Sequence, residues 1–180
     1  KGACSARNHA LRLAQGDAIQ WLDADDLLGE GKLNAQLKLL RQNSQHLVAS
    51  KWRRFAGDLT NLWPEEQGAW ASVPEQSSPI EWLLAERMLI PAGWLASRQL
   101  FDSIQPWDES LLINQDGEYF TRAILASNGV IFEPQSRVYY RSEMHGSVSQ
   151  FKPHKAPSLF ASVESFEQAV LQLGNDSAIK

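Results

Sequence analysis

The sequence contains a single cysteine, Cys4, among its 180 residues. One thiol cannot form a disulfide within the chain, so a packed core rather than a disulfide framework must hold the fold together. Cys4 lies in a turn of small residues, which favours a packing role over a nucleophilic one. An excess of positive charge is also lacking, because 17 Lys and Arg against 21 Asp and Glu give a formal net charge of −4. We therefore expect no nucleic-acid partner.

Long hydrophobic runs are absent as well. No run approaches the length of a membrane span, and no signal-peptide pattern opens the sequence. We therefore expect a cytoplasmic protein, with membrane association only through parts outside this sequence. With 43% hydrophobic and 21% charged residues, the composition is that of a globular chain of one-domain length.

The most distinctive segment is residues 19–28, Ile-Gln-Trp-Leu-Asp-Ala-Asp-Asp-Leu-Leu, a strand-like run that ends in three clustered aspartates. Adjacent unpaired carboxylates raise each other's pKa, whereas a divalent cation stabilises them. Oxygen ligands suit Mg²⁺ or Mn²⁺. Mg²⁺ usually takes one or two carboxylates and completes its coordination with water and substrate phosphate. The cluster therefore indicates a cation bound to a nucleotide diphosphate.

A simpler explanation exists for the same aspartates. Asp25 or Asp26 can cap the following helix, and the remaining carboxylates would then be solvated. The predicted apolar face of that helix carries Leu33, Leu37 and Leu40. By spacing alone, the two interpretations are equally good.

The segment before the acid cluster predicts a short helix within residues 1–17 that ends at Gly16. Its inward face would carry four apolar residues: Ala6, Ala10, Leu13 and Ala14. A helix followed by a strand and an acid cluster forms an α/β unit.

Residues 2–8 (Gly-Ala-Cys-Ser-Ala-Arg-Asn) and 16–26 (Gly-Asp-Ala-Ile-Gln-Trp-Leu-Asp-Ala-Asp-Asp) resemble the core of a family 2 glycosyltransferase of the A-type fold. The resemblance is specific, because the small-residue turn, Ala-Arg-Asn, Gly-Asp and Asp-Ala-Asp-Asp follow in the family's order and spacing. It implies an α/β, Rossmann-like fold, a nucleotide-sugar donor and a Mg²⁺ or Mn²⁺ cofactor. Asp23 and Asp25 correspond to the family's Asp-x-Asp element and would bind the metal. Arg7, Asn8 and Asp23 would contact the donor.

Residues 140–149 resemble the family's late loop, whose Arg and His approach the pyrophosphate. Arg141 would clamp phosphate, because the guanidinium fits phosphate geometry. His145 would bind the metal or a phosphate. The alternative for His145 is that it is simply a solvated side chain in a polar loop.

Residues 106–122 resemble the family's acceptor-side segment, in which an acidic pair at a helix start supplies the general base. Here the pair is Gln115-Asp116 instead of the commoner Glu-Asp, and the aspartate is kept. An inverting transfer needs a carboxylate that takes the acceptor's proton while its oxygen attacks the anomeric carbon from the face opposite the nucleotide. Asp116 is the predicted base. Its alternative role, as N-cap of the helix, is compatible with the first.

The resemblance also suggests contacts to the acceptor. Residues 91–98 resemble the family's acceptor-side strand entry, which makes Gly93 and Trp94 candidates. Gln115 and Glu118, next to the predicted base, are further candidates.

Seven tryptophans are present, and aromatic rings can stack on sugars. Four of them fall in or beside a stretch rich in Pro, Glu, Gln and Ser, which predicts a long irregular connection: Trp52, Trp63, Trp70 and Trp82. Trp82 and Trp94, with Glu86, would line an acceptor site. The alternative is that Trp94 belongs to the core and that one helix face carries Trp82, Leu83, Arg87 and Met88.

The resemblance covers about residues 1–150, the predicted partial catalytic core. Residues 151–180 would form an amphipathic extension that covers the core or a partner. Its helix would start at Ser158, end at Gly174 and carry one apolar stripe: Leu159, Val163, Phe166 and Val170.

Complete family members begin with further strands that bind the nucleotide base. We therefore expect a C-terminal portion of a longer enzyme that lacks the N-terminal nucleotide-binding strands. Alone, this portion would be inactive and would bind nucleotide sugar weakly or not at all. An exposed sheet edge would favour a homo-oligomer.

Two functions fit the sequence. The first is inverting, divalent-metal-dependent transfer of a sugar to a glycan, a lipid-linked or another hydroxyl acceptor. The second is a non-catalytic or regulatory fragment that retains the glycosyltransferase fold, since fold does not imply function.

Overall fold

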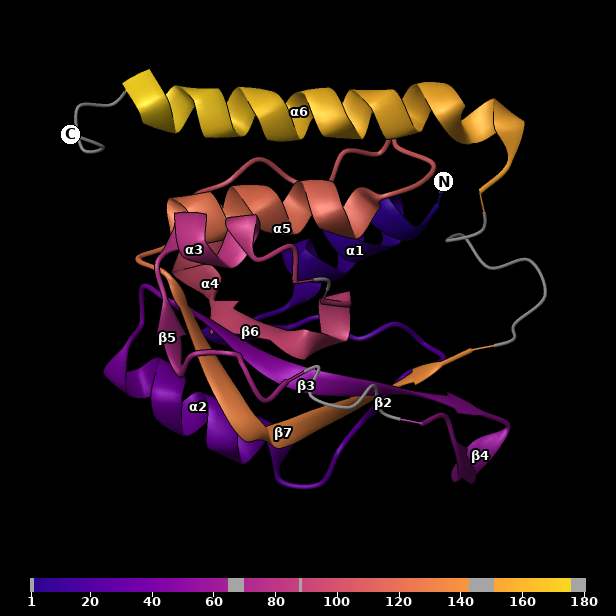
Figure 1. Cartoon of the computed structure of the whole chain (residues 1–180), viewed down its shortest axis with the longest axis vertical. Coiled ribbons are helices and arrows are strands. Elements are labelled where there is room, and N and C mark those ends of the chain that lie inside the picture. Colours follow the sequence, from indigo (N-terminus) through magenta and orange to yellow (C-terminus); the bar gives the residue numbers. More distant parts are fainter. Residues whose placement is uncertain (1, 65–69, 88, 143–150, 176–180) are drawn as a thin grey trace.

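A seven-stranded mixed sheet forms the centre of the molecule (Figure 1). The computed structural model describes residues 2–64, 70–87, 89–142 and 151–175. The strands are β1 (Ala18–Gln20), β2 (Leu27–Leu28), β3 (Leu47–Ala56), β4 (Asp58–Leu62), β5 (Gln76–Ser77), β6 (Trp94–Ser97) and β7 (Val130–Arg141). The order is β1-β6-β3-β7-β2, with β4 paired to β3 and β5 to β7. β3 and β7 are parallel, whereas β6 is antiparallel to both β1 and β3.

Helices cover both faces of this sheet. They are α1 (Ala3–Leu13), α2 (Lys32–Gln42), α3 (Pro79–Leu84), α4 (Arg98–Asp102), α5 (Gln115–Ala126) and α6 (Ala156–Asn175), with short 3₁₀ turns η1 (Pro91–Gly93) and η2 (Pro153–Lys155). In Figure 1, α2 lies below the sheet, while α1, α3, α4 and α5 lie above it. α6 forms an outer layer on α5. The predicted α/β fold is therefore confirmed.

The central strand β3 shows why the sheet needs both layers. Leu47, Val48 and Ala49 are all completely buried, so this part of β3 does not alternate between core and solvent. Such a continuous apolar run is typical of strands that have helices on both faces. Val48 pairs with Ile131 of β7 on one side and Leu95 of β6 on the other.

An aromatic cluster fills the space between the sheet and the upper helices. Trp107 stacks on Tyr119 with ring centroids 4.0 Å apart, and Trp21 meets both rings edge-on. Trp94 stacks on Phe120 at 5.4 Å. Aromatic pairs of this kind contribute about 0.5–1.5 kcal/mol each beyond the burial of their surface. The cluster therefore fixes α5 over the first and sixth strands.

The inward face predicted for the first helix is wrong. Cys4 and Asn8 are the buried residues of α1, whereas Leu13 is 66% exposed. The Asn8 amide donates to the Trp107 carbonyl oxygen and to Glu109, and its oxygen accepts from the Trp107 amide. A polar residue points inward because it satisfies main-chain groups of a distant loop. Burial raises the pKa of Cys4 to about 11, in agreement with a packing role.

The second helix also packs through polar residues. Lys32 and Gln36 are buried together with Leu40 of the predicted apolar face, whereas Leu33 of that face is 38% exposed. Lys32 Nζ donates to Gln20 Oε1 at 2.6 Å and to Gln36 Oε1 at 2.5 Å. Gln36 then donates to the main-chain oxygens of Val48 and Gly93. Burial lowers the pKa of Lys32 to about 7.

Two further expectations need correction. Trp52 lies in β3, and the β3–β4 hairpin extends to Leu62, so the predicted irregular connection begins only after it. The last helix begins at Ala156, before Ser158, and its predicted inward residues Val163 and Phe166 are 53% and 40% exposed. No helix in the described part of the chain is long and apolar enough to cross a membrane.

We expect Asn8→Ala to lower the free energy of unfolding by about 3 kcal/mol, because it leaves the buried main-chain groups of Trp107 without partners. Urea denaturation followed by tryptophan fluorescence measures this loss. His9→Ala, on the exposed side of the same helix, is the control and should change stability by less than about 0.5 kcal/mol. Equal losses of stability from the two substitutions would contradict a stabilising role of the hydrogen bonds between Asn8 and the Trp107 main chain.

Candidate active site

The acid loop, residues 21–26, follows β1 directly. Trp21 anchors its start in the aromatic cluster, which leaves the aspartates beyond the end of the strand. Arg7 Nη2 contacts the two carboxylate oxygens of Asp23 at 2.8 and 2.7 Å, and the Arg7 guanidinium lies 4.5 Å from the centre of the Trp107 ring. Arg7 and Asp23, which were both predicted to contact the sugar donor, are therefore close together, and they form an ion pair with each other.

Asn8, the third predicted donor residue on this side, faces elsewhere. Its amide is held by the Trp107 main chain and Glu109, as described above. The structure thus gives Asn8 an internal role in place of the predicted donor contact, because its hydrogen-bonding groups already have partners.

Asp26 is the buried member of the acid loop. Its carboxylate accepts a hydrogen bond from the Arg141 main-chain amide at 3.0 Å. Burial raises the pKa of Asp26 to about 6, and the negative charges of Asp25 and Asp23 contribute to the same shift. The three carboxylates therefore lie close enough to repel one another.

The capping interpretation of this loop is wrong. α2 is preceded by Gly31 in the left-handed conformation, and no side chain caps it. Arg141 stabilises the loop instead, because its Nε donates to the Asp25 main-chain oxygen at 3.0 Å and its guanidinium lies over Phe55. Arg141, the predicted phosphate contact, thus lies at the acid loop, and its Nε is already bonded to the main chain of Asp25.

Within the described ranges, no three His, Cys, Asp or Glu side chains converge as a metal site. The predicted ligand His145 lies outside the described residues. Asp23 is paired with Arg7, and Asp26 is buried, whereas Asp25 is only half-buried. Of the three aspartates, Asp25 is therefore the one best placed to bind a cation together with a diphosphate.

Asp116 lies in the first turn of α5. The N-cap is Asn114, in the left-handed conformation with φ of 55°, so the capping role predicted for Asp116 is wrong. Burial raises the pKa of the Asp116 carboxyl, while its own amide, the Gly117 amide and Arg7 act in the opposite direction. The negative charge of Asp23 also raises it. Asp116 is therefore close to the Arg7–Asp23 pair, although a long stretch of sequence separates them.

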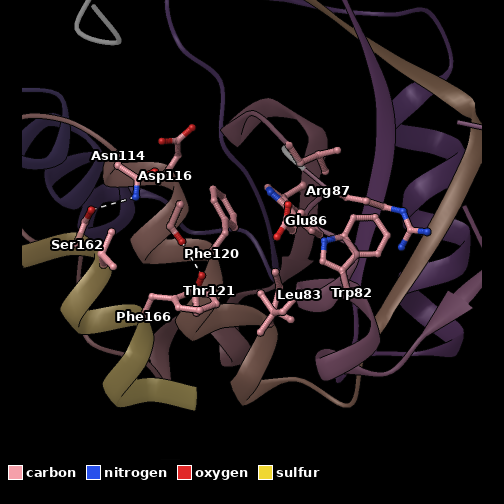
Figure 2. A pocket seen from close by; sticks show the side chains of 15 residues that line it. Trp82, Leu83, Glu86, Arg87, Asn114, Asp116, Phe120, Thr121, Ser162 and Phe166 are labelled. Carbon is pink, nitrogen blue, oxygen red and sulfur yellow. Dashed lines mark hydrogen bonds between the residues drawn. The ribbon is translucent and has the colours of Figure 1, made fainter. Parts of the chain in front are cut away.

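A pocket of about 370 Å³ opens beside Asp116 (Figure 2). It lies between α3, α5 and α6, and its walls come from fifteen residues, among them Trp82, Leu83, Glu86, Arg87, Trp94, Asn114, Phe120, Thr121, Ser162, Val163 and Phe166. Figure 2 shows Asp116 at the rim next to Asn114, with Trp82 and Arg87 across the opening. The pocket therefore adjoins the candidate base.

The predicted acceptor residues divide into two groups. Trp94, which is 2% exposed, packs in the core, as its alternative interpretation predicted, and its ring also forms part of the pocket wall. Gly93, Gln115 and Glu118 are not part of the wall. Their contacts are internal.

The reasons are specific to each residue. A Cβ at Gly93 would lie 2.8 Å from Leu89, so this glycine allows close packing. Gln115 donates to the Leu111 main-chain oxygen at 2.6 Å. Glu118 is buried in an ion pair with Arg122 at 2.6 Å and accepts from Ser165 Oγ.

Sequence reasoning missed the walls that α5 and α6 contribute. Phe120, Thr121, Ser162 and Asn114 were not among the predicted site residues, yet all of them line the pocket. Only Phe120 carried a usable signal, because it follows Asp116 by one helical turn and therefore lies on the same side of the helix.

Comparison with known sequences adds the decisive observation. The pattern of Glycosyl transferase family 2 matches residues 1–105, which is more than half of the chain. The chain belongs to the family 2 glycosyltransferases. The matched part includes α1, the acid loop and Trp94, while Asp116 lies beyond it.

One relative of this family 2 chain is an uncharacterized glycosyltransferase of Haemophilus influenzae, 48% identical over 48 residues. The aligned segment is 27% of this chain and 18% of the relative. The chain therefore matches only a small part of that protein's length.

Solved structures resemble the fold at low identity. The chain aligns with Staphylococcus aureus TarS 1–349 in complex with UDP-GlcNAc with a TM-score of 0.69 and 15% identity, covering 88% of this chain and 45% of that one. GalNAc-T7 with UDP, GalNAc and Mn²⁺ gives 0.65 and 16%, covering 92% and 35%. At these identities the likeness concerns the fold, and it confirms the A-type glycosyltransferase architecture. The family 2 chain spans less than half the length of both.

We expect Asp26→Asn to stabilise the chain at neutral pH. The pKa of Asp26 is about 6 in the folded protein against an ordinary value of 3.8, so the folded state holds this proton more tightly and stability falls as the pH rises from about 4 to about 6. The amide keeps an acceptor for the Arg141 amide but has no charge to bury. The gain should be about 2–3 kcal/mol at pH 7.5 and should vanish towards pH 4.

Denaturant unfolding of both proteins at the two pH values measures this difference. Asp17→Asn, at an exposed carboxylate, serves as the control and should show no such pH-dependent gain. An advantage of Asp26→Asn that is the same at pH 4 and pH 7.5 would rule out a buried charge at this position.

Proposed function

We propose that this chain carries the acceptor side and part of the donor side of an inverting glycosyltransferase. The reaction is transfer of a sugar from a nucleotide-sugar donor to an acceptor hydroxyl. The observation that carries the proposal is the position of Asp116, which lies near the Arg7–Asp23 pair and at the rim of a pocket. A base for this reaction needs that position, with the donor on one side and the acceptor on the other.

Asp116 is the proposed general base. The acceptor oxygen forms a bond to the anomeric carbon while the bond to the nucleotide phosphate breaks, and its proton moves to a carboxylate oxygen of Asp116. A raised pKa makes a carboxylate a stronger base. Burial supplies this shift, and the amides of the first turn of α5 keep the carboxylate oriented.

Arg7 and Arg141 are the proposed diphosphate contacts. Both guanidinium groups lie at the acid loop, Arg7 through Asp23 and Arg141 through the Asp25 main chain. Planar guanidinium groups fit phosphate oxygens well. We propose that Asp23 orients Arg7. The sequence had instead predicted that Asp23 contacts the metal and the donor directly.

Asp25 is the proposed protein ligand of a divalent cation, Mg²⁺ or Mn²⁺. Burial is the main cause of the raised pKa of Asp26, and the negative charges of Asp25 and Asp23 add to it; a cation bound at Asp25 would offset this local negative charge. A bound cation would neutralise charge on the departing diphosphate. GalNAc-T7, a structural neighbour, was solved with UDP, GalNAc and Mn²⁺, which supports the proposal by analogy of fold.

A non-catalytic role is the second candidate. It is favoured by the ion pair that occupies the Asp23 carboxylate and by Gln115 in place of the commoner glutamate. The discriminating experiment is a donor screen with the full-length gene product. Release of nucleoside diphosphate from one sugar nucleotide, with Mn²⁺ or Mg²⁺, would favour the enzyme.

We expect Asp116→Asn to reduce turnover of the full-length protein by two to four orders of magnitude, about the usual contribution of a positioned base. The amide keeps the shape of the side chain but cannot take the proton. Donor affinity, measured by calorimetry, should stay nearly unchanged. Asp102→Asn, at an exposed carboxylate of α4, is the matched control. Turnover close to wild type in Asp116→Asn would remove this residue from the chemistry.

We expect Asp25→Ala to abolish the response of turnover to added Mn²⁺ or Mg²⁺ while the thermal unfolding midpoint stays within a few degrees of wild type. The half-buried side chain contributes little to the core, so its loss should affect function alone. Glu30→Ala, at an exposed carboxylate nearby, should keep the full metal response. Persistence of that response in Asp25→Ala would show that the cation, if used, binds elsewhere.

A further inference from the structure

The left-handed backbone conformations of non-glycine residues in the described part of the chain occur at one place. Two non-glycine residues there have a clearly positive φ, Glu86 at 50° and Asn114 at 55°. Both line the pocket beside Asp116, although they come from different parts of the sequence. Residues held in such conformations are enriched at ligand-binding sites, where the surrounding structure maintains them. Both residues lie at helix ends, Glu86 just after α3 and Asn114 directly before α5, so these two helix ends shape the pocket wall.

The wall of the pocket is mainly hydrocarbon. Eight of its residues are apolar: Trp82, Leu83, Leu89, Trp94, Phe120, Ile124, Val163 and Phe166. Three of its uncharged polar side chains are already engaged with one another or with the main chain, while Glu86, Arg87 and Asp116 contribute charged groups to the wall. Thr121 Oγ1 donates to the Gly117 main-chain oxygen at 2.7 Å, and Asn114 Nδ2 donates to Ser162 Oγ at 3.0 Å. A ligand in this pocket is therefore held chiefly by apolar contact.

The outer helix α6 forms one side of the pocket wall, and its apolar side chains there remain partly exposed. α6 is attached to α5 through serines: Ser158 accepts from the Leu112 amide, Ser162 from Asn114, and Ser165 donates to Glu118. Phe166 and Val163 are not used for this attachment and remain 40% and 53% exposed. They face the pocket instead, as Figure 2 shows for Phe166.

We propose that this pocket binds a hydrocarbon group of the acceptor, so that the acceptor is an amphiphile whose hydroxyl lies at Asp116 and whose apolar part lies between α3, α5 and α6. A volume of about 370 Å³ is within the range of small-molecule pockets. The assignment of the acceptor hydroxyl rests on the proposed function. The apolar binding itself does not.

Two glucosides that share one sugar test the proposal directly. Octyl β-D-glucoside, kept below its micelle-forming concentration, and methyl β-D-glucoside are titrated into the 180-residue chain by calorimetry. Each buried methylene strengthens binding by about fourfold, so the octyl compound should bind saturably and at least ~100-fold more tightly than the methyl compound.

Two phenylalanines of α6 form a matched pair of variants. Phe166→Glu places a charge in the pocket wall and should weaken octyl glucoside binding by at least ~10-fold. Phe160→Glu makes the same change at a position outside the wall that is 70% exposed, and it should leave the affinity within about twofold. Val163→Glu, one turn before Phe166, repeats the test in case one variant folds poorly.

The outcomes separate this proposal from the proposed base. Tight octyl binding that only the pocket variants weaken supports the proposal, even if Asp116→Asn retains its turnover. Equal affinity for both glucosides overturns it, even if Asp116→Asn abolishes turnover. An equal loss in Phe160→Glu and Phe166→Glu also overturns it, because the chain would then bind the alkyl group elsewhere.

Discussion

The packing around Trp107 joins the two halves of the candidate site. Its ring stacks on Tyr119 of α5 on one side and carries the Arg7 guanidinium at 4.5 Å, while its main chain is held by Asn8. Arg7 in turn holds Asp23 of the acid loop. The acid loop and α5, which carries the proposed base Asp116, therefore share one aromatic residue as their common support. The electrostatic influence of Arg7 and Asp23 on Asp116 depends on this arrangement.

A second constraint acts below the sheet. Lys32, Gln20 and Gln36 form a buried polar network that fixes the start of β6 and with it Trp94. Because the pKa of Lys32 is lowered to about 7, this network is close to its titration point under physiological conditions. Burial disfavours the charged form of Lys32 in the folded state. Lys32 therefore lowers the free energy of unfolding most below pH 7, and this cost decreases as the pH rises from about 7 towards the ordinary lysine pKa of 10.5.

The sequence predicted those features that depend on local pattern. A short strand followed by the acid loop, the helix that begins near Asp116 and the last helix were all expected from apolar periodicity and turn residues. The inward face of α1 was not predicted, and that of α2 was predicted only at Leu37 and Leu40, because Asn8 and Gln36 are buried to satisfy main-chain groups of other elements. The spacing of apolar residues along a helix gives no information about such distant main-chain partners.

The errors at the site have a similar origin. A motif assigns Arg7 and Asp23 each to a ligand, yet it does not reveal that the two side chains bind one another. Glu118 had the right residue type near the base, but Arg122 and Ser165 occupy it. Trp82, Glu86 and Trp94 were predicted to line one site, and all three line the pocket, but the walls from α5 and α6 could not be predicted, since helices that are distant in sequence have to meet before the pocket exists.

The attachment of α6 by serine hydroxyls has a consequence for how this molecule can change over time. Residues 1–105, which match the family, include the acid loop, whereas α6 lies outside that match. Because the hydrogen bonds that tie the described part of α6 to the rest of the chain come from serines, substitutions at its exposed side chains, such as Phe160, leave the main core untouched. The outer helix can therefore accept substitutions at positions that neither bond to the rest of the chain nor line the pocket, while the residues beneath it keep their packing.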